Sequence, residues 1–211
     1  MRLYSWSVAP NPRRVRMFLA EKGIDIEIVD VAHPDKWATV SDEYREKFPH
    51  RRVPLLELDD GDWIAETPAI CRYLEALYPE PSLMGRTPRE VAAVETWDRI
   101  AEWDGMMAAG EVYWNTSKAF AGRSLPGYRE ALPQIPALAE RGELRLIAFY
   151  ETLDERLSGF DYLAGDFFSL ADITAFCAIG FAGLRKIGIP ETCPNLLRWH
   201  AGMDARPSAQ A

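Results

Sequence analysis

The chain has 211 residues, of which 48% are hydrophobic, so it is long enough for one large domain or two smaller ones around a real core. Its 24 Lys+Arg and 32 Asp+Glu give a net charge of −8 without a basic stripe, which excludes a typical nucleic-acid binder, and no apolar run approaches the roughly 20 residues of a membrane span. The start of the chain lacks the apolar segment of a signal peptide and the three cysteines are widely spaced, so we expect a cytoplasmic protein without a disulfide framework or a metal motif.

The first elements alternate between strand and helix. A strand begins at residues 2–4, and Asn11-Pro12 starts a helix that Gly23 ends. Residues 24–31 contain a second strand. A strand, a helix and a strand of these lengths predict a parallel pair of strands joined by a right-handed crossover.

Residues 51–78 predict a strand, a tight turn, a second strand and a helix. The apolar run in residues 55–58 suits a buried strand, Asp60-Gly61 is a strong hairpin signal, and residues 63–65 supply the returning strand. Thr67 is expected to be the N-cap of the following helix, with Pro68 at its first position.

The composition changes after this unit. With a short polar segment at residues 41–48 that favours a helix, residues 1–78 give a compact α/β domain of the thioredoxin type. Residues 79–86, which include two prolines and a glycine, predict a linker. Residues 87–211 contain helical patterns only, so we predict an all-α C-terminal domain.

Two capping boxes mark helices in this second domain. Thr87 and Glu90 open a helix that is expected to run to about residue 117, with Gly105 and Gly110 as places where it bends. Ser169 and Asp172 open a helix that is apolar nearly all round, which places it at the centre of the domain. The spacing of this pair makes Asp172 a structural cap rather than a catalytic acid.

Two further helices complete the predicted domain. Residues 137–157 form the first, with Leu144, Ile147, Tyr150 and Leu157 near one face, and residues 194–203 form the last. The segment between residues 120 and 136 holds five Gly and Pro residues and is expected to be a long connection.

Two features of residues 51–78 indicate a binding site. A cis bond at Val53-Pro54 would turn the backbone N–H and C=O of Val53 outward as a docking edge for a peptide. Glu66-Thr67 lies at a helix N-terminus, where free N–H groups favour a carboxylate. A site with both features would hold a short acidic peptide, although Thr67 also has a simpler interpretation as a cap.

This arrangement resembles the cytosolic glutathione transferases over essentially the whole chain. The matching stretches are residues 10–16, Val53-Pro54, Glu66-Thr67 and residues 169–172. The resemblance implies glutathione as co-substrate, with Val53 beside a cis Pro54 pairing with its cysteinyl backbone. It also implies that Glu66 binds the ammonium and Thr67 the carboxylate of the γ-glutamyl end, and that Arg52 reaches the glycyl end.

The residue that activates the thiol departs from the family pattern. Members with Ser or Cys in this loop place it at the position of Ala9, which has no group to donate. Asn11 is the first candidate, since its amide or N–H would face the sulfur at a helix N-terminus and its neighbours Pro10 and Pro12 have no N–H. Asn11 has an equally weighted role as a helix cap. Ser5 and Ser7 are the alternatives.

The electrophile is expected between the two domains, against the long helix that starts at Pro88. An aromatic-rich helix is more often core than pocket, but a hydroxyl on it would assist the thiolate or orient a substrate. The residues expected to face the electrophile are Met106, Gly110, Tyr113, Trp114 and Ser117. Five arginines are expected to form a local positive region that attracts anionic glutathione: Arg13, Arg14, Arg16, Arg51 and Arg52.

The resemblance implies an enzyme of glutathione conjugation that acts on small apolar electrophiles, as in detoxification. It also implies a homodimer, with the helix from Pro68 and the start of the helix from Pro88 at the interface; no nucleic acid or membrane is expected as a partner. Two alternatives stay open: a glutathione-dependent disulfide reductase or peroxidase, and a non-catalytic glutathione-binding module. The histidines, His33, His50 and His200, have no metal-type neighbours and receive no role.

Overall fold

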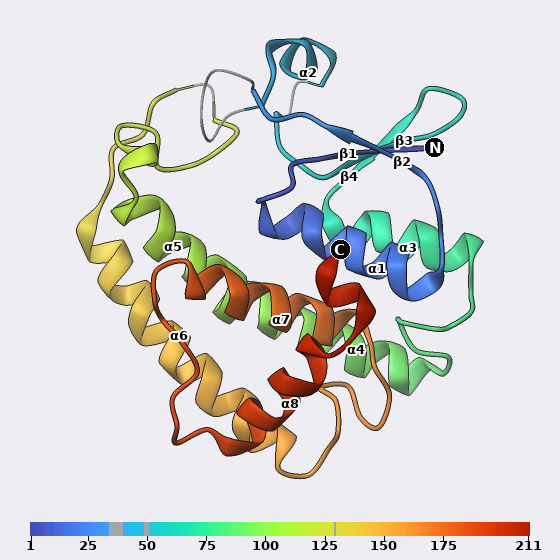
Figure 1. The fold of residues 1–211 in the computed structure, drawn as a ribbon, viewed down its shortest axis with the longest axis vertical. Helices are drawn as coiled ribbons and strands as arrows, with labels where there is room; N and C mark the ends of the chain where they lie inside the picture. Colours follow the sequence, from blue (N-terminus) through green and yellow to red (C-terminus); the bar gives the residue numbers. More distant parts are fainter. Residues whose placement is uncertain (34–39, 49–50, 129) are drawn as a thin grey trace.

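The structure is a computed structural model that describes residues 1–33, 40–48, 51–128 and 130–211. Within these residues a small sheet with three helices is followed by a larger, wholly helical part (Figure 1). This confirms the predicted fold class. The limits of the two domains, at residues 78 and 87, stay predictions. No helix in the described ranges is long and apolar enough to cross a membrane.

The sheet has the strand order β2-β1-β3-β4. Strand β1 (Arg2–Ser5) pairs in parallel with β2 (Glu27–Asp30), which confirms the predicted parallel pair. On its other side β1 pairs antiparallel with β3 (Leu55–Glu57), and β3 with β4 (Trp63–Ala65) through the predicted hairpin. A mixed sheet of this order therefore brings the ends of β1, β3 and β4 side by side.

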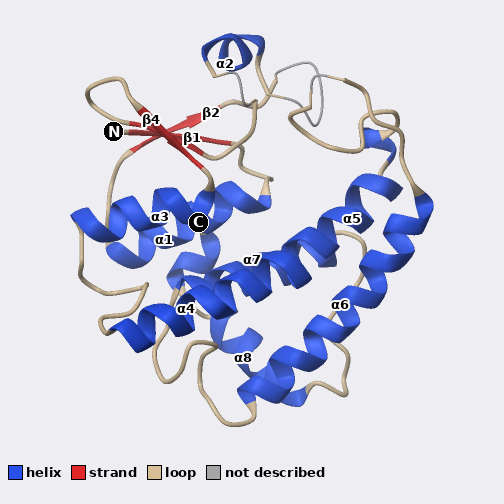
Figure 2. Ribbon diagram, turned by 180° about the vertical axis from the view of Figure 1, so that it is seen from behind, coloured by secondary structure: helices blue, strands red, loops and turns tan. Residues whose placement is uncertain are grey.

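Helices cover both faces of this sheet (Figures 1 and 2). Helices α1 (Pro10–Lys22) and α3 (Thr67–Leu77) lie on the face toward the helical part, and the short α2 (Asp42–Lys47) lies on the other. Gly23 ends α1 in a left-handed conformation (φ +63°), as its position predicts. Since α1 packs against both α3 and α7, it joins the sheet to the rest of the molecule.

The helical part begins with one long helical stretch. It comprises α4 (Pro88–Ile100), the π-helical turn η1 (Ala101–Met106) and α5 (Met107–Thr116), and it opens on the predicted capping box of Thr87 and Glu90. The π-helical turn includes Gly105, one of the two places where a bend was predicted. The remaining elements are η2 (Lys118–Phe120), α6 (Pro136–Leu157), α7 (Leu170–Gly183), α8 (Pro194–Asp204) and η3 (Pro207–Gln210).

Helix α7 is the centre of this part and is buried almost along its whole length, as its composition predicts. The buried Asp172 carboxylate accepts hydrogen bonds from the N–H and hydroxyl of Ser169, from the Leu163 N–H and from Nε1 of Trp199, at 2.9–3.1 Å. Burial raises the pKa of Asp172 to about 6, against these four donors. The predicted cap is confirmed, and it also fastens two other segments to α7.

The predicted apolar face of α6 was wrong in part. Tyr150 and Leu157 are buried, but Leu144 is 74% exposed and Ile147 is 41% exposed. The buried face instead runs through Leu146, Phe149 and Leu153, among others, one to two positions away along the chain. A shift of this size turns a helical face by about 100° per residue, because one turn takes 3.6 residues.

Candidate functional site

The strand register brings three predicted site residues to one end of the sheet. Leu55 pairs with Tyr4 on one side and with Ala65 on the other. The residues one step further along each strand, Ser5, Pro54 and Glu66, therefore lie at the same edge. The Val53-Pro54 bond at this edge is cis, as predicted.

The α3 N-terminus also opens at this edge, with a correction to the predicted cap. Glu66, and not Thr67, is the N-cap, and its backbone is left-handed (φ +70°). Thr67 is the first helical residue, and its side chain is buried. Instead of capping its own helix, Thr67 Oγ1 donates a hydrogen bond to the backbone carbonyl of Asn11 at 3.3 Å. The N-termini of α1 and α3 are thus tied together.

The α1 N-terminus presents a single first-turn donor. Pro10 and Pro12 have no N–H, and the N–H of Arg13 bonds the Ala9 carbonyl at 3.3 Å. The N–H of Asn11, in the first turn, has no partner within its helix. The predicted role of Asn11 as a cap was wrong, because Ala9 is the N-cap and has no side-chain cap bond. Asn11 therefore has both an amide and a backbone N–H at the positive end of α1.

The two alternative serines are both engaged with Arg16. Ser5 is buried, and its Oγ accepts a hydrogen bond from Arg16 Nη1 at 2.8 Å. Ser7 is exposed, and its backbone carbonyl accepts from Arg16 Nη2 at 3.0 Å. A serine hydroxyl that accepts a hydrogen bond can still donate its own hydrogen, so Ser5 stays an alternative to Asn11 as the group next to a sulfur.

Arg52, predicted at the glycyl end, lies beside the connection that follows α5. Its guanidinium stands over the ring of Tyr128 at 5.4 Å, and a Cβ on Gly127 would come within 2.6 Å of its Cγ. The Arg52 carbonyl accepts a hydrogen bond from Tyr44 Oη at 2.6 Å, and burial raises the pKa of that phenol. The backbone just before the cis bond is therefore fixed to α2 through the Tyr44 hydroxyl.

The five residues predicted to face the electrophile are not equally exposed. Met106 and Ser117 are buried, and the ring of Trp114 covers Gly110, where a Cβ would lie 2.6 Å from the ring. Tyr113 and Trp114 are partly exposed, and both rings pack against Phe181 of α7, with centroids 5.1 and 6.2 Å away. Of the five residues, Tyr113 and Trp114 are the ones whose side chains are accessible to a ligand.

Arg14 was expected in a positive surface region, and this expectation was wrong. Its side chain is completely buried and points into the helical part. Arg13 also turns away, with Nη2 donating to the Ala209 carbonyl at 2.8 Å. Sequence reasoning missed the groups that receive Arg14, which are Asp98, Glu102, Thr174 and Asn11. The spacing of Asp98 and Glu102, one helical turn apart, indicates a shared acidic face but does not identify Arg14 as its partner.

The three cysteine thiols are buried and are poor nucleophiles. Burial raises the pKa of Cys71 and that of Cys193, and it raises the pKa of Cys177 to about 11. A thiol with a raised pKa is protonated near neutral pH and is a poor nucleophile. Within the described ranges, no group of three or more His, Cys, Asp or Glu residues is placed to hold a metal ion. His50 lies outside the described residues.

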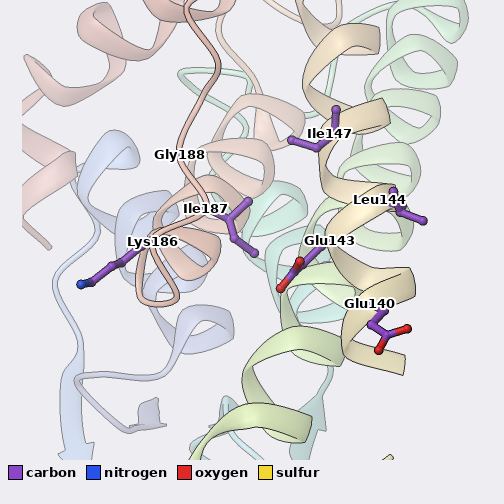
Figure 3. Close-up of a pocket in the computed structure, with 7 residues that line it drawn as sticks. All are labelled: Glu140, Glu143, Leu144, Ile147, Lys186, Ile187 and Gly188. Carbon is purple, nitrogen blue, oxygen red and sulfur yellow. The ribbon is translucent and has the colours of Figure 1, made fainter. Parts of the chain in front are cut away.

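A separate open concavity of about 620 Å³ lies between α6 and the segment after α7 (Figure 3). Leu144 and Ile147 line it from α6, and Ile187 faces them from the other side. None of its lining residues comes from the sheet or from α1 and α3. It is therefore distinct from the edge at which Pro54, Glu66 and Asn11 gather.

Comparison with known proteins places this geometry in context. Family models of the glutathione S-transferase N-terminal and C-terminal domains match residues 3–82 and 126–207. Glutathione S-transferase 2 of Saccharomyces cerevisiae is 34% identical over 214 residues, which cover 100% of this chain and 88% of the yeast protein.

Solved structures agree with this result. A glutathione S-transferase domain-containing protein of Marinobacter aquaeolei has a TM-score of 0.86 at 34% identity and 99% coverage of both chains. A glutathione S-transferase of Methylobacillus flagellatus, solved with glutathione bound, has a TM-score of 0.81 at 25% identity, with 99% of this chain and 96% of that one covered.

Proposed function

Because the chain belongs to the cytosolic glutathione transferase superfamily, we propose that it conjugates the thiolate of glutathione to small hydrophobic electrophiles. The thiol loses its proton, and the sulfur forms a bond to an electrophilic carbon. In an addition the product then takes up a proton, and in an aromatic substitution a leaving group departs with its electron pair. The protein positions and stabilises the thiolate and supplies no covalent nucleophile.

The observation that carries the proposal is the hydrogen bond between Thr67 and Asn11. It joins the positive ends of α1 and α3 at the edge that also holds the cis Val53-Pro54 bond. Glutathione is an anionic tripeptide with a backbone, two carboxylates and a thiol. The Val53 backbone would pair with its cysteinyl residue, and the α3 N-terminus would receive its γ-glutamyl carboxylate.

The other contacts follow from the same placement. The exposed carboxylate of Glu66 would bind the γ-glutamyl ammonium, and Arg52 would reach the glycyl carboxylate. The Methylobacillus relative, which holds glutathione, supports glutathione as the co-substrate here. Tyr113 and Trp114 would contact the electrophile. We further propose a cytoplasmic homodimer that uses α3 and the start of α4 as its interface.

Asn11 would lower the pKa of the bound thiol. A free thiol has a pKa of about 8.5, so it is mostly protonated at neutral pH. Hydrogen bonds to the charged form of a group favour that form. The amide and the N–H of Asn11, at the positive end of α1, supply such bonds without a hydroxyl at position 9. The raised thiol pKa values of the protein's own cysteines argue against disulfide chemistry through a protein thiol, and a reductase that uses two glutathiones is distinguished by turnover.

The test is the ultraviolet absorbance of the thiolate of bound glutathione as a function of pH. We expect an apparent pKa at least one unit below the free value in the wild type, and a return toward about 8.5 in Asn11→Ala. Asn195→Ala, which removes an amide from α8, is the matched control. An unshifted thiol in the wild type would overturn conjugation in favour of a binding module.

Turnover rates on two kinds of substrate distinguish conjugation from disulfide reduction. With glutathione, the wild type is expected to act faster on an aryl halide than on a small disulfide, and the opposite order would favour the reductase. Ser5→Ala and Ser7→Ala test the alternative activating residues. A larger loss of the thiol shift in either serine variant than in Asn11→Ala would remove Asn11 from this role.

A further inference from the structure

Arg14 connects α1 to three elements of the helical part. Its Nε donates to Thr174 Oγ1 of α7 at 3.0 Å, and its Nη2 to Asp98 Oδ1 of α4 at 3.4 Å. Its Nη1 donates to Glu102 Oε1 of η1 at 3.3 Å and to Asn11 Oδ1, one turn back on α1, at 3.0 Å. Since the side chain is fully buried, the guanidinium has no access to glutathione and cannot bind it directly.

The contact with Arg14 fixes which end of the Asn11 amide points outward. A guanidinium has donors and no acceptor, so only the carbonyl oxygen of an amide can face it. The amide nitrogen of Asn11 must therefore point the other way. Among the described residues, Nδ2 of Asn11 has no hydrogen-bond partner, so both of its hydrogens are available to a ligand.

The guanidinium itself is held firmly. Asp98 and Glu102 surround it with negative charge, and Thr174 Oγ1 both accepts from Arg14 and donates to Asp98 Oδ1 at 2.5 Å. The forked geometry of a guanidinium directs its N–H groups along fixed lines. The orientation of the Asn11 amide is consequently set from the helical part of the molecule.

We propose that Arg14 is a positioning residue that holds the Asn11 amide with Nδ2 directed at the glutathione sulfur. The inference rests on the proposed function, since it requires Asn11 to stabilise the thiolate. An amide free to turn over would present its carbonyl oxygen to the sulfur part of the time, and that oxygen repels a thiolate. With the carbonyl bound to Arg14, the donor orientation exists before glutathione binds, which is the kind of preorganisation that stabilises charge in an active site.

Arg14→Lys is the first test, because it keeps the buried positive charge near Asp98 and Glu102 but loses the forked donors. We expect the apparent pKa of the bound thiol to rise by about half a unit to one unit, with a change in the KM for glutathione of about threefold or less. The loss in kcat is expected to be about three- to tenfold at neutral pH and to disappear at high pH, where the thiol ionises unaided.

The double variant Asn11→Ala/Arg14→Lys shows whether the effect passes through Asn11. The pKa of the bound thiol in the double variant should equal that in Asn11→Ala, because the amide that Arg14 positions is absent. An equal further rise in both backgrounds would overturn the proposal, since it would mean that Arg14 acts on the sulfur by charge alone. A folded Arg14→Lys with the wild-type thiol pKa would overturn it as well.

Two further variants complete the design. Thr174→Val removes the Nε acceptor with little change in shape, and it carries the same prediction if Arg14→Lys fails to fold. Arg206→Lys, in an ion pair with Glu21 elsewhere on α1, is the matched control and should leave the thiol pKa unchanged. A normal thiol pKa in Asn11→Ala would remove the assignment of Asn11 itself. A shift in Asn11→Ala without one in Arg14→Lys and Thr174→Val would remove only the role of Arg14.

Discussion

Arg206 forms a two-pronged ion pair with Glu21, which lies 185 residues earlier in the chain. Nε and Nη2 of Arg206 donate to the two carboxylate oxygens at 2.8 and 2.7 Å, and the Ser208 hydroxyl donates to one of them. The segment after α8 is therefore fastened to α1, the helix that carries Asn11.

This pair makes part of the stability depend on pH. Burial alone would raise the pKa of Glu21, but hydrogen bonds from Arg206 and Ser208 bring it below the ordinary value. The stabilisation is therefore fully present above the unfolded-state pKa of about 4.3 and is lost as the pH falls through the lower pKa of the folded state. We expect urea unfolding of Glu21→Gln to show a deficit of about 1–3 kcal/mol at pH 7. That deficit should shrink between about pH 5 and pH 3. A deficit of constant size across this range would contradict the assignment.

Thr67 can be tested through its hydroxyl. Thr67→Val removes the bond to the Asn11 carbonyl but keeps the shape of the side chain, so we expect a rise of about tenfold in the KM for glutathione, with a smaller change in kcat. Thr67→Ser should restore the wild-type KM within about twofold. Thr96→Val, which removes a hydroxyl bonded within α4, is the control. Steady-state kinetics with equal KM values in Thr67→Val and Thr67→Ser would exclude a role for this hydroxyl.

Asp172 should matter for folding and not for chemistry. Asp172→Ala leaves buried donors of Ser169, Leu163 and Trp199 without an acceptor, so we expect a loss of about 3 kcal/mol or more in the free energy of unfolding. The exposed Asp25→Ala should change it by less than about 0.5 kcal/mol. Thiolate absorbance in the folded Asp172→Ala protein should match that of the wild type. A changed thiol pKa there would place Asp172 in the reaction after all.

A substitution at Gly110 tests whether Trp114 belongs to the proposed electrophile site. A Cβ at this position would meet the Trp114 ring at 2.6 Å, so Gly110→Ala must displace that ring. We expect kcat/KM for a bulky aromatic electrophile to change by about tenfold, or roughly 1.4 kcal/mol, with an unchanged KM for glutathione. Gly183→Ala, where a Cβ meets nothing within 4 Å, is the matched control. Equal kinetics in the two variants would place Trp114 outside the electrophile site.

Much of the fold followed from local sequence chemistry. Gly23, Asp60-Gly61 and the two capping boxes each specify a turn or helix end through bonds made within a few residues. The cap at Thr67 was placed one residue late, because Glu66 adopts a left-handed backbone that is uncommon for its residue type. The exposed face of α6 was misassigned because Leu144 and Ile147 are apolar but face the solvent.

The site was less accessible to sequence reasoning. The edge that holds Val53-Pro54 and Glu66 could be anticipated, since both belong to one strand, hairpin and helix unit. The burial of Arg14 could not, because it depends on acceptors 84, 88 and 160 residues away. An arginine next to Arg13 and Arg16 has no local feature that distinguishes a buried guanidinium from an exposed one.

The π-helical turn η1 decides how the side chains of α5 are rotated about the helix axis relative to those of α4. It lies between α4, which carries Asp98, and α5, which carries Tyr113 and Trp114. Each residue of an α-helix turns the chain by about 100°. Deleting one residue here would rotate Tyr113 and Trp114 relative to Asp98 of α4, with no change in the composition of either α-helix. The length of η1 thus decides which way the aromatic residues of the proposed electrophile site face relative to the helix that holds Arg14.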